Sequence, residues 1–431
     1  MRILFISNYF PGDLGPLARL LGAAPENDVL FASNRQRRDF ALSGVRRVRL
    51  KNCPPLFGEG TPGVVHIWEQ VIQRGGGGLR TLLSLRESWG MPDMVFCSLA
   101  AGAAFFAPQA FPDSYFVTYA ESGLKNYSLL PAETRNAWAL AQSTLLLQGN
   151  LRFAFSEEER RLFPRALREA IRLVPPCVDT DVFSRAAAAP WPDGEEGEGA
   201  LLLTLNAIGS DGRALAGLLA VARAALREMP ECRVVMLTEN RGRSDALRAA
   251  CAAWPEGWRA RLAVHDTLPF LRYRDLLAAS SVVVCPGGGE TAQRAMLQAM
   301  SCEALLMARA GAANFLRPGV NMLALPPLAA GGAGPGDHPA PGATPSGVGP
   351  ASAAVVGAPA SPASAEAVVL AALHSRRGSG GHAPGPSPQG RTARRNVLAH
   401  FSEATVMPRH LAEVMQAWTA WKQERDRKRA R

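Results

Sequence analysis

The chain of 431 residues contains little lysine and no long apolar run. Lysine occurs only at Lys51, Lys125, Lys422 and Lys428, whereas Lys and Arg together number 47 and the net charge is +10. Abundant arginine and alanine are typical of a GC-rich genome, and no recognition motif or aromatic-interleaved basic stripe accompanies the charge. We therefore predict no nucleic-acid partner. No stretch of about eighteen apolar residues predicts a transmembrane helix.

The N-terminal segment MRILFISNYFPGDLG has an apolar run too short for a secretory signal and no small-residue cleavage site. We expect it to be a first strand and the protein to be cytoplasmic. Seven cysteines, odd in number and scattered, form no C-x-x-C pair. This pattern argues against a disulfide framework and a zinc site. The motifs H-E-x-x-H and G-x-S-x-G and a P-loop lysine are also missing, so we predict no metal and no cofactor.

Short apolar runs alternate with helical patterns through most of the chain. Strands are expected over 2–7, 28–33, 45–50, 94–99, 115–120 and 152–156, and again over 200–206, 232–238, 261–266, 281–286 and 304–308. Helices are expected over 15–23, 68–89, 132–147, 213–229, 244–254, 270–280 and 290–301. Such alternation predicts an α/β protein with parallel sheets covered on both faces. We predict two doubly wound, Rossmann-like domains.

Composition divides the chain into four parts. Residues 1–190 form the predicted first domain, a Pro- and Gly-rich linker follows, and residues 199–328 form the second. Residues 329–390 are low in complexity, which favours a mostly disordered insert. Its apolar patch at 364–375 indicates a helix. Residues 391–431 predict two C-terminal helices that pack back on the domains and end in a basic tail.

Two segments resemble family 4 glycosyltransferases, which have the GT-B fold. One is IRLVPPCVDTDVF, in which Val178, Asp179, Asp181 and Phe183 fit a family turn. The other runs from RDLLAASSVVVCPGGGE to GVNMLAL, and its AM pair at 299–300 fits a family helix. The start, RILFISNYFPGDLGPLARLL, resembles the acceptor domain of one bacterial subgroup. The resemblance implies two domains that face a cleft and transfer of a sugar from a nucleotide sugar.

The resemblance implies a donor site around the loop CPGGGE. Glycines before a helix let backbone N–H groups approach a diphosphate, and the helix N-terminus favours negative charge. The implied donor-binding residues are Gly287, Gly288, Gly289, Thr291, Gln298 and Arg213. Glu290 is the implied catalytic acid of the sugar loop. The same glycine loop could equally be a simple strand-to-helix turn, and Glu290 a surface residue that favours the helix dipole.

Several positions depart from the family pattern. Gln298 stands where a ribose-binding acid is usual, and Ala207 and Asp211 stand where a basic pair clamps the diphosphate. Arg213 is the nearby replacement, although it also fits an ordinary first-turn helix residue. Asn314, Glu303 and Cys177 replace a further acid and two turn glycines.

On the acceptor side the resemblance implies Glu121 as a catalytic residue, with Gly12 and Gly15 in the first loop facing the cleft. Ser98 stands where a histidine is usual. Glu121 could also be a solvated loop carboxylate, and the two glycines ordinary turn residues. No other catalytic constellation competes with this one.

Three hypotheses follow. The first is a retaining hexosyltransferase whose partners are a nucleotide sugar and an envelope glycan, lipid-linked or protein acceptor. The second is an inactive GT-B scaffold or binding protein, favoured by the lost basic pair and ribose acid. The third is a partner bound through positive charge. The basic tail around Trp418 and Trp421 would then contact the inner face of the membrane.

Overall fold

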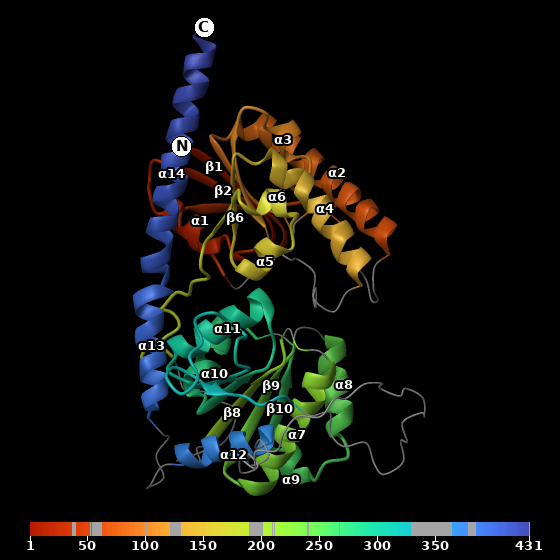
Figure 1. Ribbon diagram of the computed structural model, residues 1–431, viewed down its shortest axis with the longest axis vertical. Coiled ribbons are helices and arrows are strands. Elements are labelled where there is room, and N and C mark those ends of the chain that lie inside the picture. The colour runs from red at the N-terminus through yellow and green to blue at the C-terminus, as the bar shows by residue number, and fades with distance from the viewer. Residues whose placement is uncertain are drawn as a thin grey trace, which may run out of the picture.

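The computed structural model describes residues 1–36, 40–51, 53, 63–99, 102–120, 131–188, 201–208, 210, 212–238, 241–266, 268–328, 364–377 and 385–430, without the side chains of 289–291. Two parallel sheets lie one above the other in Figure 1, each with helices on both faces. The predicted α/β class with two doubly wound domains is thereby confirmed. The predicted strands all occur, although several begin or end up to three residues away from the expected bounds.

The first sheet has seven strands in the order β3-β2-β1-β4-β5-β6-β7. Its strands are β1 (Arg2–Phe10), β2 (Asp28–Gln36), β3 (Val45–Arg49), β4 (Met94–Ser98), β5 (Tyr115–Ala120), β6 (Leu151–Ala154) and β7 (Ile171–Leu173). Its helices are α1 (Gly15–Gly22), α2 (Val64–Trp89), α3 (Ala107–Ala110), α4 (Ala132–Gln148), α5 (Glu157–Arg161) and α6 (Arg165–Arg168). Strand β7 begins the segment IRLVPPCVDTDVF, for which no strand was predicted.

The second sheet has six strands in the order β10-β9-β8-β11-β12-β13. Its strands are β8 (Leu201–Asn206), β9 (Cys232–Leu237), β10 (Leu262–His265), β11 (Val282–Cys285), β12 (Leu305–Ala308) and β13 (Leu323–Ala324). Its helices are α7 (Gly212–Glu228), α8 (Arg241–Cys251), α9 (Glu256–Arg259), α10 (Phe270–Ala279) and α11 (Gly289–Ser301), followed by α12 (Ala365–Arg376), α13 (Pro388–His400) and α14 (Glu403–Arg429).

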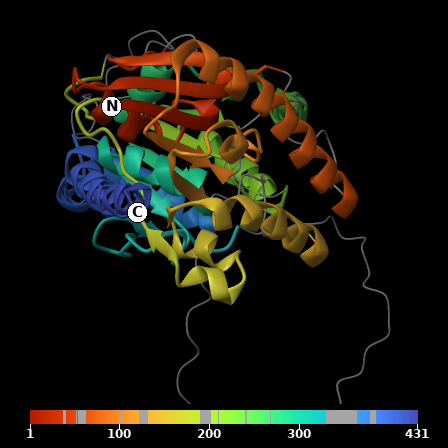
Figure 2. The same ribbon diagram turned by 90° about the horizontal axis from the view of Figure 1, so that it is seen from above.

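Along the central strands, successive side chains point to opposite faces of the sheet and belong to two separate apolar cores, one on each face. Ile3 and Phe5 pack with α1 and α14, whereas Leu4 and Ile6 pack with α2, α3 and α4. Figure 2 shows α2 and α14 on opposite sides of the molecule. Strands buried on both faces need continuous apolar sequence, which explains why these runs were visible as strands.

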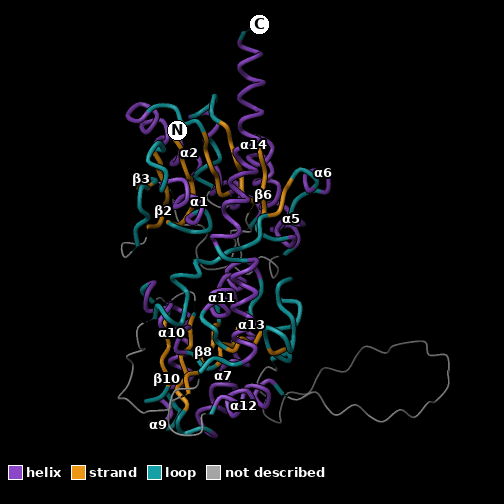
Figure 3. Tube along the Cα trace, turned by 90° about the vertical axis from the view of Figure 1, so that its left-hand side faces the viewer, coloured by secondary structure: helices purple, strands orange, loops and turns teal. Residues whose placement is uncertain are grey.

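The C-terminal helices join the two halves. Helix α13 packs on the second sheet through Ala393 and Val397, and α14 continues onto the first sheet through Val414 (Figures 1 and 3). On α14, Nε2 of His410 lies 2.7 Å from the hydroxyl of Tyr119, and both side chains are buried. The predicted return of the C-terminal helices onto the domains is therefore observed.

One part of the predicted disordered insert is ordered. Helix α12 lies within 329–390 and buries Val369 and Leu373 in the core that α7 forms on the second sheet. The apolar patch there marked a real helix, because its burial offsets the chain entropy that the flanking Ala, Gly and Pro residues cannot offset. Residues 329–363 and 378–384 lie outside the described part of the chain.

Helix α2 passes through four consecutive glycines. A Cβ on Gly78 would lie 2.3 Å from the carbonyl oxygen of Ala103, in the segment after β4, whereas one on Gly76 would meet nothing within 4 Å. Glycine is unfavourable in a helix interior, so its use at position 78 is explained by this close approach. The described helices include none long and apolar enough to cross a membrane.

These two glycines give a matched test of the packing. Gly78→Ala should lower the free energy of unfolding by about 1–3 kcal/mol, because backbone cannot move aside as a flexible side chain can. Gly76→Ala should raise it by about 0.5–1 kcal/mol through helix propensity. Urea denaturation of both variants measures the difference, and equal effects would contradict the packing described here.

Candidate active site at the domain junction

Each sheet has one pair of neighbouring strands from which the chain proceeds outward to opposite edges of the sheet. In the first sheet β1 and β4 are neighbours, and the chain proceeds outward from them to β3 and to β7. In the second sheet β8 and β11 are neighbours in the same way. Loops that follow such a strand pair diverge and leave a crevice at the carboxyl edge, where α/β proteins bind ligands. The carboxyl edges of the two sheets face each other across the junction (Figure 1).

The predicted glycine loop lies at the crevice of the second sheet. Strand β11 ends at Cys285, and α11 begins at Gly289. Gly288 is the N-cap residue, and no side chain there accepts a hydrogen bond from the first helical N–H groups. Gly287 is buried and Gly288 exposed, and a Cβ on Gly288 would meet nothing within 4 Å. Local packing therefore does not demand glycine at 288, and the start of α11 is accessible.

Helix α11 carries the other donor residues that the resemblance implied. Glu290 and Thr291 are its second and third residues, but their side chains lie outside the described part of the structure. Gln298 is half-buried two turns later. Because residues 290 and 298 are eight apart, they lie on one side of the helix. Their roles stay predictions.

The loop after β8 contains buried polar groups but not the basic pair that the resemblance implies. Ala207 is fully buried there, and Arg213 is exposed on the first turn of α7. The carbonyl of Ser210 accepts a hydrogen bond from Nη1 of Arg243 at 2.7 Å. The hydroxyl of Ser210 is buried and has no hydrogen-bond partner among the described residues. Asp211 lies outside the described residues.

The predicted acceptor-side residues fall at the crevice of the first sheet. Gly12 has a φ of +50°, and a Cβ on Gly15 would lie 2.6 Å from Cβ of Pro11, so this tight loop requires glycine at both positions. Ser98 is the last residue of β4 and is fully buried. Glu121 lies outside the described residues. The structure thus brings Gly12, Gly15 and Ser98 to neighbouring strand ends.

One arginine buried behind these strand ends was not predicted from the sequence. Arg74 of α2 is fully buried and donates from Nη2 to Oδ1 of Asn8 on β1 at 2.9 Å. A Cβ on Gly102, after β4, would lie 3.2 Å from Nε of Arg74. Burial lowers the pKa of Arg74. Arg74 directly precedes the glycine run, and the sequence pattern there indicated only a helix.

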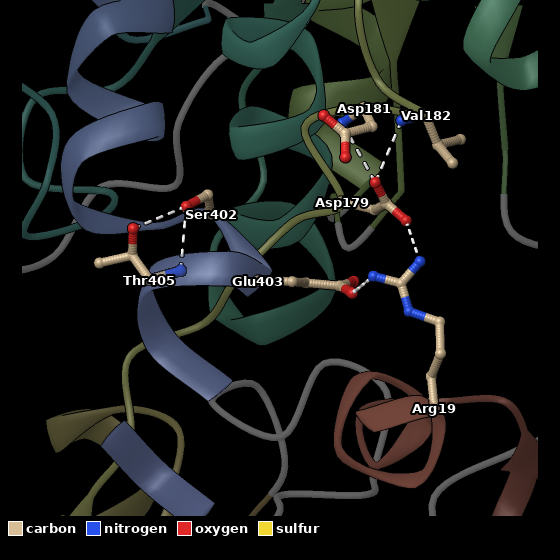
Figure 4. A network of polar contacts seen from close by, with 7 residues as sticks. All are labelled: Arg19, Asp179, Asp181, Val182, Ser402, Glu403 and Thr405. Atoms are coloured by element: carbon tan, nitrogen blue, oxygen red, sulfur yellow. Dashed lines mark hydrogen bonds and ion pairs between the residues drawn. The ribbon is translucent and has the colours of Figure 1, made fainter. Parts of the chain in front are cut away.

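Charged residues also join the two domains (Figure 4). Arg19 of α1 pairs with Asp179, in the segment that leads to the second domain, and with Glu403 at the start of α14. Oδ1 of Asp179 accepts hydrogen bonds from the backbone N–H groups of Asp181 and Val182, both at 3.1 Å. The family turn recognised in the sequence therefore positions a carboxylate at the junction.

A second ion pair crosses the junction nearer the glycine loop. Arg294 of α11 pairs with Asp13, which follows β1. Their side chains keep 30% and 21% of their exposed area. Burial lowers the pKa of Arg294 to about 10, and nearby Glu403 acts against this shift. The sequence offered no signal for this pair, because Arg294 lies on the polar side of α11 with Glu290 and Gln298.

Glu403 is the junction residue most sensitive to pH. Burial raises its pKa from 4.5 to about 7; Asp179 adds to the shift, and Arg19 and Arg294 oppose it. The folded chain therefore takes up a proton between pH 4.5 and 7 that the unfolded chain does not. This contribution to stability is complete below pH 4.5 and is lost as the pH rises through 7.

Glu403→Gln removes this titration. The unmodified chain should lose about 2 kcal/mol in free energy of unfolding from pH 5 to pH 8 through this titration, and the variant should not. The free energy of unfolding of the variant, measured relative to that of the unmodified chain, should therefore rise by about 2 kcal/mol over this range. Urea denaturation at both pH values measures the gain. Glu413→Gln, on the same helix and paired with Arg172, is the control and should show little change. A constant difference between Glu403→Gln and the unmodified chain would refute the assignment.

Comparison with known proteins adds to this geometry. Residues 25–127 match the Glycosyl transferase family 4 group. This segment lies within the predicted first domain and ends after β5, outside the described residues. A search of curated protein sequences finds no match.

Solved structures resemble the chain over almost its whole length. Sucrose-phosphate synthase from Thermosynechococcus elongatus is 16% identical with a TM-score of 0.62, and the alignment covers 97% of this chain and 100% of that one. Anabaena HepE in complex with UDP and glucose is 12% identical with a TM-score of 0.60 over 97% and 100%. A glycosyltransferase from Rickettsia africae is 10% identical with a TM-score of 0.57 over 96% and 98%.

At these identities the likeness concerns the fold, and it spans both sheets. Part of the first domain is matched independently by sequence. The chain therefore has the GT-B fold, and its first domain carries the sequence pattern of the glycosyl transferase family 4 group.

Proposed function

We propose that this chain is a glycosyltransferase. It would move a sugar, with retention of configuration, from a nucleoside-diphosphate sugar to an envelope glycan, a lipid-linked sugar or a protein. The observation that carries the proposal is the accessible glycine loop and N-terminus of α11, at the β8–β11 crevice and opposite the β1–β4 crevice. HepE, which has a similar fold, was solved with UDP and glucose.

The chemistry of this reaction matches the groups at the junction. When the bond to the sugar breaks, negative charge grows on the diphosphate leaving group. Backbone N–H groups and the positive end of α11 would stabilise that charge without a metal. The described residues contain no cluster of His, Cys, Asp and Glu suited to a metal ion. Glu290 and Gln298 would hold the sugar and ribose, and Glu121 would orient the acceptor hydroxyl.

A second candidate function is a GT-B scaffold without catalysis. Two observations favour it: Ala207 stands where the resemblance implies a base, and the ion pair between Asp13 and Arg294 spans the junction. In such a protein the junction would be an internal contact and would bind no nucleotide. Ligand binding therefore separates the two candidates.

Thermal unfolding with UDP, GDP, ADP, CMP and TDP tests the proposal. A nucleotide at a hundred times its Kd should stabilise the folded chain by about 2.7 kcal/mol. We expect a clear rise in Tm with one nucleotide and a smaller rise in Gln298→Ala, because position 298 would hold the ribose. Glu256→Ala, exposed on α9 at the far end of the second domain, is the matched control. No shift with any nucleotide at millimolar concentration would exclude a working donor site and favour the scaffold.

The proposal also places the protein in the cytoplasm, in contact with anionic lipid through the end of α14. Several basic residues there already have partners: Arg425 and Arg429 bond Asp113, and Lys428 pairs with Glu424. Arg427 is exposed in the last turn. This end of α14 extends past the first sheet (Figure 3).

Charge reversal tests the lipid contact. The double variant Arg427→Glu and Lys428→Glu should lose at least tenfold in binding to phosphatidylserine vesicles, because each basic residue near such a surface contributes about 1 kcal/mol. Sedimentation with vesicles measures it, and neutral phosphatidylcholine vesicles serve as the control. Equal binding by variant and unmodified chain would contradict the contact.

A further inference from the structure

Arg294 occupies a particular place on α11. It follows position 290 by four residues and precedes position 298 by four, so the three positions lie along one side of the helix. Under the proposed function, position 290 serves the sugar and position 298 the ribose. In a nucleoside-diphosphate sugar, the diphosphate is the covalent link between the sugar and the ribose. A cation at position 294, between these two positions, would therefore lie next to the diphosphate.

The loop after β8 carries no basic residue of its own, although Nη1 of Arg243, on α8, donates a hydrogen bond to its Ser210 carbonyl. Ala207 is fully buried and carries no charge, and Arg213 is exposed on a different helix. Arginine suits a diphosphate because its planar guanidinium donates two parallel hydrogen bonds to phosphate oxygens. Arg294 is thus the basic residue on the same helix as the glycine loop, within two turns of its start.

The partner of Arg294 is itself an anion. Asp13 comes from the tight loop after β1, between the two required glycines, and its carboxylate contacts the guanidinium across the junction. Both side chains are largely removed from solvent. Burial lowers the pKa of Arg294 to about 10 although Glu403 opposes the shift, so the charged guanidinium is destabilised by lost hydration and is favoured by anionic partners.

We propose that Arg294 binds the diphosphate of the donor, and that Asp13 is an internal carboxylate which occupies the guanidinium until the donor displaces it. This inference rests on the proposed function, because the donor it names is a nucleoside-diphosphate sugar. The exchange replaces one carboxylate by a diphosphate of higher charge. Arg19 pairs with Asp179 and Glu403 beside this site, and Glu403 also interacts electrostatically with Arg294.

Calorimetric titration with pyrophosphate tests the inference, because pyrophosphate carries neither base nor sugar. Arg294→Gln should weaken binding at least tenfold. Asp13→Asn should strengthen it severalfold, because the amide is a weaker competitor for the guanidinium. If the pair only joined the domains, the two variants would change binding in the same direction or not at all. Opposite signs are therefore the result that supports the exchange.

Matched variants control for charge and folding. Arg223→Gln removes one positive charge from an exposed site on α7 and should bind pyrophosphate like the unmodified chain. Arg294→Lys keeps the charge and should recover part of the affinity lost in Arg294→Gln. Thermal unfolding confirms that each variant is folded. Unchanged binding in Arg294→Gln, or a loss in Arg213→Gln instead, overturns the inference.

The result also distinguishes this inference from the proposed function. If the unmodified chain binds no nucleotide, the proposed function fails. Pyrophosphate binding by Asp13→Asn then tests separately whether Arg294 binds an anion. Pyrophosphate binding that appears in Asp13→Asn, and disappears when Arg294→Gln is added, keeps Arg294 as an anion-binding residue. Absence of binding in Asp13→Asn overturns the inference as well. If nucleotide binds and Arg294→Gln has no effect, only the inference fails.

Discussion

The carboxyl edges of the two sheets face each other, and every candidate site residue depends on that relative orientation. Each sheet buries apolar cores, and the C-terminal helices contribute to cores of both. Across the junction stand Arg19 with Asp179 and Glu403, Arg294 with Asp13, and the rings of Phe40 and Phe270, whose centroids are 4.9 Å apart. Partly exposed ion pairs contribute little free energy. Their effect is to favour one relative orientation.

The chain crosses between the two domains twice, once after β7 and once between α13 and α14. The segment after β7 and the break between α13 and α14 run side by side. The N–H of Val178 donates to the carbonyl of Phe401, and the N–H of Glu403 donates to the carbonyl of Val178, both at 2.9 Å. Asp179 and Glu403 directly adjoin this bridge and share Arg19. The backbone thus fixes two carboxylates close together, which is why burial and mutual repulsion raise the pKa of Glu403.

Local pattern predicted the elements of the fold well, and for a physical reason. Strands buried on both faces and helices with one apolar side leave their period in the sequence, so both sheets and the C-terminal helices were foreseen. Even the helix through the glycine run was predicted, although it begins at Val64 rather than at residue 68. Helix α12 shows that composition alone does not predict which residues are ordered. A short apolar patch can pack when a complementary surface such as that of α7 is present.

The candidate site was harder to foresee than the fold. The glycine loop and the side of α11 were located by resemblance, because they depend on local sequence. The contacts of Arg74 with Asn8 and of Arg294 with Asp13 join residues far apart in the chain, and no spacing rule indicates them. The turn at Asp179 was recognised as a family motif, but its contact with Arg19 appears only when α1 and α14 are placed in space.

The missing basic pair therefore need not mean a missing diphosphate site. Electrostatic stabilisation depends on where charge stands relative to the leaving group and on how little water surrounds it, and any segment may supply that charge. In this chain the loop after β8 lacks the expected cations, while α11 carries an arginine on the side that the donor would occupy. Asp13 then has a physical reason to be there, since an unpaired buried guanidinium would be costly when no donor is bound. Function in this fold has to be judged from such placed charges.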